Sequence, residues 1–143
     1  MPVLSPDLMR KLPLRTPADL EWHTLLHAAT LRDAWPRWMA AAHVPDLTPA
    51  RDQVFEHFYF AIQAALEGLG VVMGPLALIS EELRAGRLLA PISEPALRTR
   101  GYFVYAPEAS SDAPAVTALR KWLVDAGSLA ETEFATYLSA NCS

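Results

Sequence analysis

The feature that most constrains the fold is a regular alternation of short apolar runs with amphipathic segments. Apolar strand candidates lie at residues 23–28, 54–56 and 71–73, and two more lie at 88–89 and 102–105. The segments after the first three carry apolar residues three and four positions apart, which is the spacing of one helix face. Alternating strands and helices form right-handed βαβ units. The sequence therefore predicts an α/β fold of three layers, with a mainly parallel sheet flanked by helices.

Four helices are expected, each with a recognisable beginning or end. Asp33 is placed to cap the first helix, Gly68 or Gly70 closes the second, and Gly74-Pro75 opens the third. The fourth is expected to end before Gly127, followed by a loose tail at residues 128–143. The expected buried faces consist of Trp35, Trp38, Met39 and Ala42; of Ile62, Ala65, Leu66 and Leu69; of Leu76, Ile79 and Leu83; and of Val116, Leu119, Trp122 and Leu123.

Composition and charge exclude several classes of partner. The net charge is −4 and the basic residues are scattered, whereas a nucleic-acid surface needs clustered Lys and Arg. The single cysteine, Cys142, allows no internal disulfide, which favours a reducing compartment. Residues 1–6 do not resemble a signal peptide, and no apolar stretch approaches the ~20 residues that span a bilayer. We therefore expect a cytoplasmic protein without membrane contact and without a DNA-binding surface of its own.

The sequence contains no recognisable catalytic or metal-binding motif. The four histidines lack metal-ligand spacing, and Gly68-Leu69-Gly70 lacks the glycine, lysine and hydroxyl residue that complete a phosphate-binding loop. Cys142 has no base near it in sequence, and no serine lies in a nucleophile elbow. We expect no metal, no cofactor and no enzyme activity. An active site assembled from distant residues is the least favoured alternative.

Two strand-to-helix junctions are the candidate binding sites. In a doubly wound sheet, ligands bind where strands end and helices begin, and helix N-termini attract anions. The first junction supplies His57, Phe58 and Tyr59, and the second supplies Gly74 and Pro75. An aromatic wall and a tyrosine hydroxyl suit a small anionic effector. The alternative is that Phe58 packs in the core, and for Tyr59 the two interpretations are equally weighted.

Several ordered motifs resemble the effector-binding domain of LysR-type transcription regulators. The strings AALEGLGVVMGP at 64–75 and ELRAGRL at 82–88 are similar to that family's glycine-rich stretch. PVLSP at 2–6 and TPADL at 16–20 resemble its opening segments, and GYFV at 101–104 and LRKWL at 119–123 its closing strand and helix. Leu26-His27 followed by WPRW at 35–38 is similar to the branch of the glycine-cleavage and β-lactamase regulators.

The resemblance implies one lobe of a domain like a type 2 periplasmic binding protein. It covers residues 1–127 as the effector-binding domain, comprising the second lobe, a returning hinge strand and a final helix, with 128–143 as a tail. It implies that the helix-turn-helix and the first half of the first lobe are absent, so DNA is contacted only through that missing part. It also adds the hinge residue Tyr102 to the effector site and implies a homo-oligomer. The alternative is a free-standing solute-binding or protein-interaction module from a truncated gene.

Overall fold

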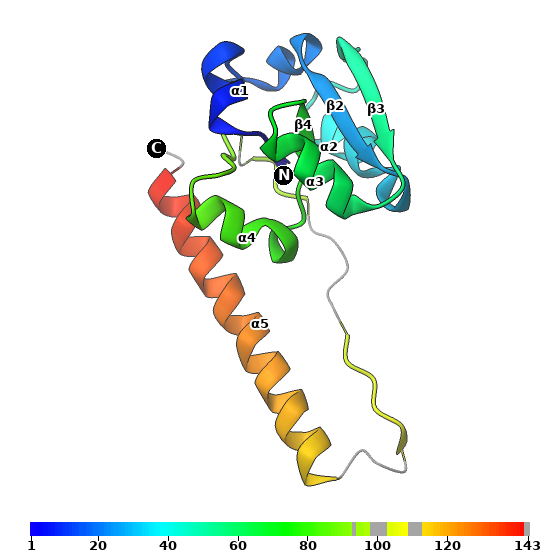
Figure 1. Cartoon of the computed structure of the whole chain (residues 1–143), viewed down its shortest axis with the longest axis vertical. Helices are drawn as coiled ribbons and strands as arrows, with labels where there is room; N and C mark the ends of the chain where they lie inside the picture. Colours follow the sequence, from blue (N-terminus) through cyan, green and yellow to red (C-terminus); the bar gives the residue numbers. More distant parts are fainter. Residues whose placement is uncertain (93, 98–102, 109–112, 142–143) are drawn as a thin grey trace. The chain divides into compact units, whose positions relative to one another are not determined.

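The computed structural model describes residues 1–92, 94–97, 103–108 and 113–141 of the chain. The chain divides into two compact units, 1–97 and 98–143. The first unit holds a four-stranded sheet with the helices that cover it, and the second holds one long helix (Figure 1). Among the described residues, no helix is both long and apolar enough to cross a membrane.

The sheet of the first unit is mainly parallel, as predicted. Its strands are β1 (Pro2–Val3), β2 (Thr24–Ala28), β3 (Arg51–Phe55) and β4 (Val71–Met73), in the spatial order β1-β4-β2-β3. β2 lies parallel to both β3 and β4, and Leu25 is opposite Asp52 on one side and Val71 on the other. β1 was not predicted as a strand; it pairs antiparallel with β4 at the edge.

The helices of the first unit begin and end close to the predicted positions. They are α2 (Ala34–Ala41), α3 (Phe58–Leu66) and α4 (Leu76–Arg84), joined by α1 (Pro6–Lys11) and the short 3-10 helices η1 (Pro17–Trp22) and η2 (Ala29–Leu31). α1, η1 and η2 were not predicted, because they are too short to show a helical period. α2 follows Asp33 as expected, although the Asp33 side chain makes no capping hydrogen bond.

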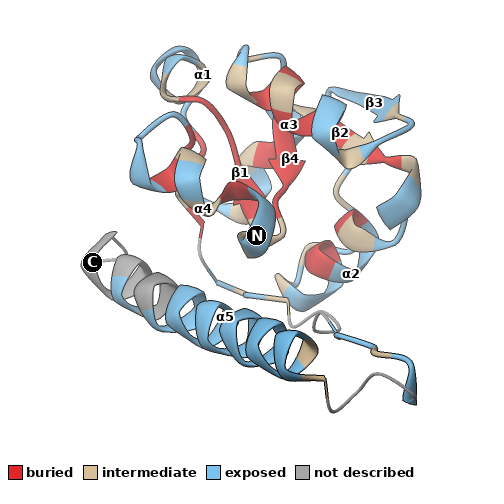
Figure 2. Cartoon of the chain, turned by 60° about the horizontal axis from the view of Figure 1, so that its bottom comes forward, coloured by how far each residue is buried: buried red, intermediate tan, exposed pale blue. Residues whose placement is uncertain are grey.

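The sheet is covered on both faces, which gives the predicted three layers. On one face Leu25 and Val71 pack in one cluster with Trp35 and Trp38 of α2. Successive strand residues point to opposite faces, so Leu26 next to Leu25 points to the other face, which α3 covers. Figure 2 shows this buried core running along β1 and β4 and the inner sides of these helices, whereas the edge strand β3 is exposed.

Three expectations about the core and strands were wrong. Leu69 is 58% exposed, because Gly68 adopts a left-handed φ of 76° that ends α3 before Leu69 can join its buried face. Leu88-Leu89 forms only a single bridge, between Leu89 and Leu4, and no strand. The described part of the expected hinge strand, Phe103–Tyr105, has no regular secondary structure.

The fourth expected helix is longer than predicted. α5 runs from Pro114 to Asn141, so it continues through Gly127 into the segment expected to be a loose tail. A glycine inside a helix costs only about 1 kcal/mol, and alanine and leucine after it favour helix. Its expected buried face is not buried, since Leu119 is 55% and Trp122 64% exposed. Among the described residues of its own unit, no other helix or strand is available to cover that face.

Substitutions of two glycines should have opposite effects on stability. A Cβ at Gly70 would lie 2.4 Å from the Thr24 carbonyl oxygen and 3.0 Å from Leu26, so the β2–β4 contact leaves no room for a side chain. We expect Gly70→Ala to lower the free energy of unfolding by about 1–3 kcal/mol, as overpacking does. Gly127→Ala, with no atom within 4 Å, should instead raise the helical content of α5. Urea unfolding and far-ultraviolet circular dichroism measure the two effects, and equal stability of both variants would contradict the packing at Gly70.

The exposed apolar face of α5 should cause the chain to associate. Leu119, Trp122 and Leu123 lie three and four residues apart on one side of the helix and are 55%, 64% and 36% exposed. Large exposed apolar patches drive pairing or poor solubility. Sedimentation should show dimers or aggregates, and Trp122→Lys should shift them toward monomer. Thr117→Lys, on the same helix outside this face, is the control, and a monomeric wild type whose Trp122 is protected from quenchers would contradict the prediction.

Candidate functional site

The candidate site lies at the edge of the sheet where the three parallel strands end. The register places Ala28 of β2 opposite Phe55 of β3, and Leu26 opposite Val72 of β4, so these strands end at one edge. η2 follows β2 there, α3 follows β3 and α4 follows β4. Both sequence-predicted junctions therefore lie at the same edge of one sheet, as expected for ligand sites in parallel sheets.

The junction at α3 presents a group of aromatic side chains to solvent. His57 is the N-cap residue, but its side chain makes no capping hydrogen bond, so the first-turn N–H groups of α3 are not satisfied by it. Tyr59 is 64% exposed and therefore lies on the surface. Phe58 is half-buried, so its burial does not decide between packing in the core and contact with a ligand. Phe60, which sequence reasoning missed, lies 6.1 Å from the His57 ring and 5.9 Å from the Tyr59 ring. Its position three residues after His57 was the available signal.

The junction at α4 is more closely packed than expected. Pro75 is the N-cap of α4 and offers no side-chain cap. Gly74 is buried, and its N–H donates to the Met1 carbonyl oxygen at 2.8 Å. A Cβ on Gly74 would lie 2.4 Å from the Ile79 Cδ1 atom, so a side chain here would force the buried Ile79 side chain of α4 to shift. The Gly74 amide is thus already bonded, and so is the Leu78 N–H, which donates to the Pro75 carbonyl oxygen at 2.9 Å. The N–H groups that this junction can offer a ligand are those at the start of α4, before Leu78.

Tyr102, the sixth predicted site residue, lies outside the described residues.

A histidine–carboxylate pair near the same edge was not predicted. The His27 Nε2 atom lies 2.7 Å from the Asp52 Oδ1 atom, and the His27 ring is 6.5 Å from that of Trp35. The pairing depends on the register of β2 and β3, which the sequence does not reveal. Elsewhere, the described residues contain no group of three or more side chains able to hold a metal ion.

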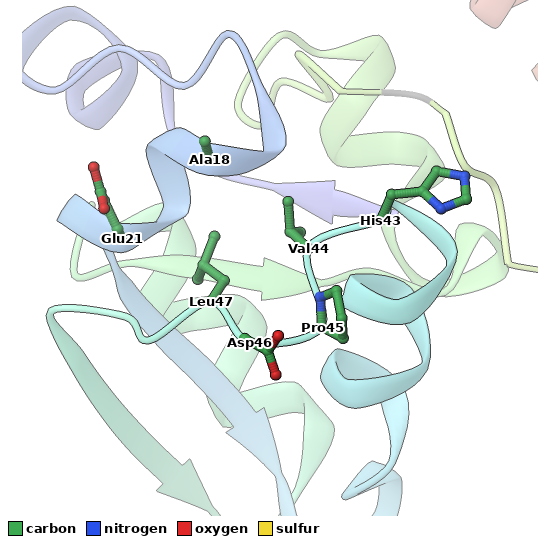
Figure 3. A pocket seen from close by; sticks show the side chains of 7 residues that line it. All are labelled: Ala18, Glu21, His43, Val44, Pro45, Asp46 and Leu47. Carbon is green, nitrogen blue, oxygen red and sulfur yellow. The ribbon is translucent and has the colours of Figure 1, made fainter.

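A shallow depression lies at the opposite edge of the sheet, away from both junctions (Figure 3). It has a volume of about 310 Å³ and is lined by η1, which precedes β2, and by the loop that precedes β3. Its central side chains are apolar, whereas Glu21, His43 and Asp46 lie around it and their polar ends do not point toward one another (Figure 3). This arrangement offers no convergent polar groups for a ligand.

A three-layer lobe with a mainly parallel sheet and two helix N-termini at one strand-end edge matches one lobe of a type 2 periplasmic-binding-protein domain, an arrangement that other doubly wound folds share. The LysR substrate binding domain matches residues 1–128. The chain belongs to this family.

Relatives and solved structures agree with this assignment. The glycine cleavage system transcriptional activator of Escherichia coli K12 is 28% identical over 94% of this chain and 44% of its own length. The HTH-type transcriptional activator AmpR of Pseudomonas aeruginosa is 32% identical over 78% of this chain and 38% of its own. The solved effector domain of AmpR from the same organism has a TM-score of 0.65 and 27% identity, covering 96% of this chain and 64% of that one. The chain therefore spans less than half the length of these curated relatives, and the predicted resemblance to their branch is confirmed.

Proposed function

We propose that the chain senses a small molecule within a LysR-type transcription regulator, by binding and not by chemistry. The observation that carries this proposal is the meeting of two helix N-termini, α3 and α4, at one strand-end edge in a chain of this family. First-turn N–H groups that no side chain caps, together with the partial positive charge of a helix start, favour an anionic effector. The aromatic rings of Tyr59 and Phe60 would form a wall beside it.

In this proposal the chain forms one wall of an effector cleft, and a second lobe closes on it. Ligand that binds the closed arrangement more tightly shifts the population toward it, and the DNA-binding parts of an oligomer move with the lobes. Tyr102 would contribute from the hinge, and the protein would act in the cytoplasm as a homo-oligomer. The rival proposal, a free-standing solute-binding or protein-interaction module, requires the same edge but no coupling to DNA.

The Tyr59 side chain provides the sharpest test of the effector edge. In a full-length regulator carrying this domain, Tyr59→Ala should weaken the effector response about 10- to 100-fold, because losing a hydrogen bond and an aromatic contact costs about 1–3 kcal/mol. DNA binding should be unchanged, and thermal stability should change little because Tyr59 is 64% exposed. The response is measured with a reporter gene or by ligand titration.

Trp22→Ala is the matched control for this experiment. Trp22 is also 64% exposed and aromatic, but it lies in η1, before β2 begins and hence at the opposite edge. It should leave the response unchanged. A Tyr59→Ala protein that melts early yet responds with unaltered sensitivity would remove Tyr59 from the site.

The isolated chain should not bind DNA sequence-specifically. Its net charge is −4, and phosphate contacts require clustered basic side chains. Fluorescence anisotropy at moderate salt should show no selective binding, whereas a full-length regulator carrying this domain should bind its operator. Submicromolar, sequence-selective binding by residues 1–143 alone would contradict the proposal that this domain binds the effector and other parts of the regulator bind DNA.

A further inference from the structure

The segment between α1 and β2 contains a buried histidine that neither the candidate site nor the family assignment explains. His23 follows η1 and is 1% exposed, and neither ring nitrogen has a hydrogen-bond partner. Buried polar groups are nearly always paired, so an unpaired buried imidazole is a site where protonation matters. Burial lowers the pKa of His23, opposed by the nearby Pro13 carbonyl and by the charge of Asp19.

The surroundings of His23 offer little compensation for a positive charge. Asp19 is the carboxylate whose charge acts on the ring. One of its oxygens already accepts hydrogen bonds from the N–H groups of Arg15 and Thr16, at 2.8 and 2.7 Å. These bonds lower the Asp19 pKa and keep the carboxylate at the start of η1. An imidazolium at position 23 would therefore be buried with only the Pro13 carbonyl close enough to stabilise it and with no carboxylate bonded to the ring, which is unfavourable.

The segment around His23 is attached mainly by side-chain burial. Leu14 and Leu20 are fully buried and belong to the cluster on the α2 face of the sheet. The backbone hydrogen bonds of residues 13–23 stay local: Leu14 N–H donates to the Met9 sulfur, and the others join residues within the segment. A segment with local hydrogen bonds can open without breaking the strand ladder.

We propose that residues 13–23, the η1 latch, are an acid-sensitive element that His23 releases from the lobe when it becomes protonated. The neutral ring fits the buried position, and the charged ring is accommodated only when the latch opens to water. Protonation of His23 is therefore linked to opening of the latch. Because the pKa of His23 is lowered in the closed latch, its stabilisation of the closed state is lost as the pH falls below 6.5, the ordinary pKa of histidine. Well above that value the ring is neutral in both the closed and the open latch, so opening no longer depends on pH.

Hydrogen exchange of the wild-type chain tests the proposal. Between pH 7.5 and 5.5, after correction for intrinsic exchange rates, amides of residues 14–24 should lose up to about tenfold in protection relative to those of β4, since one pH unit below 6.5 corresponds to tenfold. The titrations of two other groups must be distinguished from that of His23. Asp19 titrates far below this window because its pKa is lowered from 3.8. The Met1 amino group has its pKa lowered to about 6 by burial, so it titrates inside the window.

Variants isolate the contribution of His23. His23→Leu and His23→Gln should each abolish the pH-dependent loss of protection in the latch, while the Met1 contribution remains in both. His43→Asn is the matched control, because His43 is an exposed histidine whose φ of 60° asparagine also adopts. It should behave as the wild type. An unchanged pH dependence in the His23 variants, or its loss in His43→Asn, would overturn the proposal. In the wild type, a pH titration of the His23 ring resonance with a midpoint at or above pH 6.5 would also overturn the proposal.

Discussion

The packing of two tryptophans of α2 against the sheet is the interaction on which the rest of the lobe depends. Trp35 and Trp38 are 2% and 0% exposed and meet edge to face at 6.1 Å. The Trp35 Nε1–H donates to the Leu26 carbonyl at 3.1 Å, which ties α2 directly to the central strand β2. Trp38 Nε1–H donates to the Pro95 carbonyl at 2.9 Å and so ties in the end of the first unit. This layer therefore anchors β2, the central strand on which both neighbouring parallel strands pair.

Local sequence signals and strand topology explain which parts of the fold and site could be predicted from the sequence. α2, α3, α4 and β4 are marked by local signals, namely apolar periodicity and glycines such as Gly68 at positive φ. The two junctions follow from a topological rule and needed no contact information. β1, the bond from Gly74 to Met1 and the His27–Asp52 pair could not be predicted, because each joins residues far apart in sequence. α5 was misjudged at Gly127, where the weak preference of one glycine did not outweigh its helix-forming neighbours.

The candidate effector site and the buried histidine lie at opposite edges of the sheet. Uncapped helix starts and exposed aromatic rings lie at the edge where strands end, whereas η1 and its buried histidine lie before β2 begins. In the proposed regulator the first edge faces an effector and the second carries the latch. Effector binding and latch opening would then act at opposite edges of the same sheet, and could be measured independently.

The pairing of β1 with β4 has a consequence for the order of folding. Pro2 is opposite Met73, and Leu4 bridges Leu89, so the buried residues Pro2 and Leu4 acquire their partners only after most of the lobe has been synthesised. Pairings between residues so far apart in sequence are slow to form. A nascent chain ending before β4 leaves Val3 and Leu4 without their sheet neighbours, and such transiently exposed apolar segments are where chaperones bind and aggregation begins.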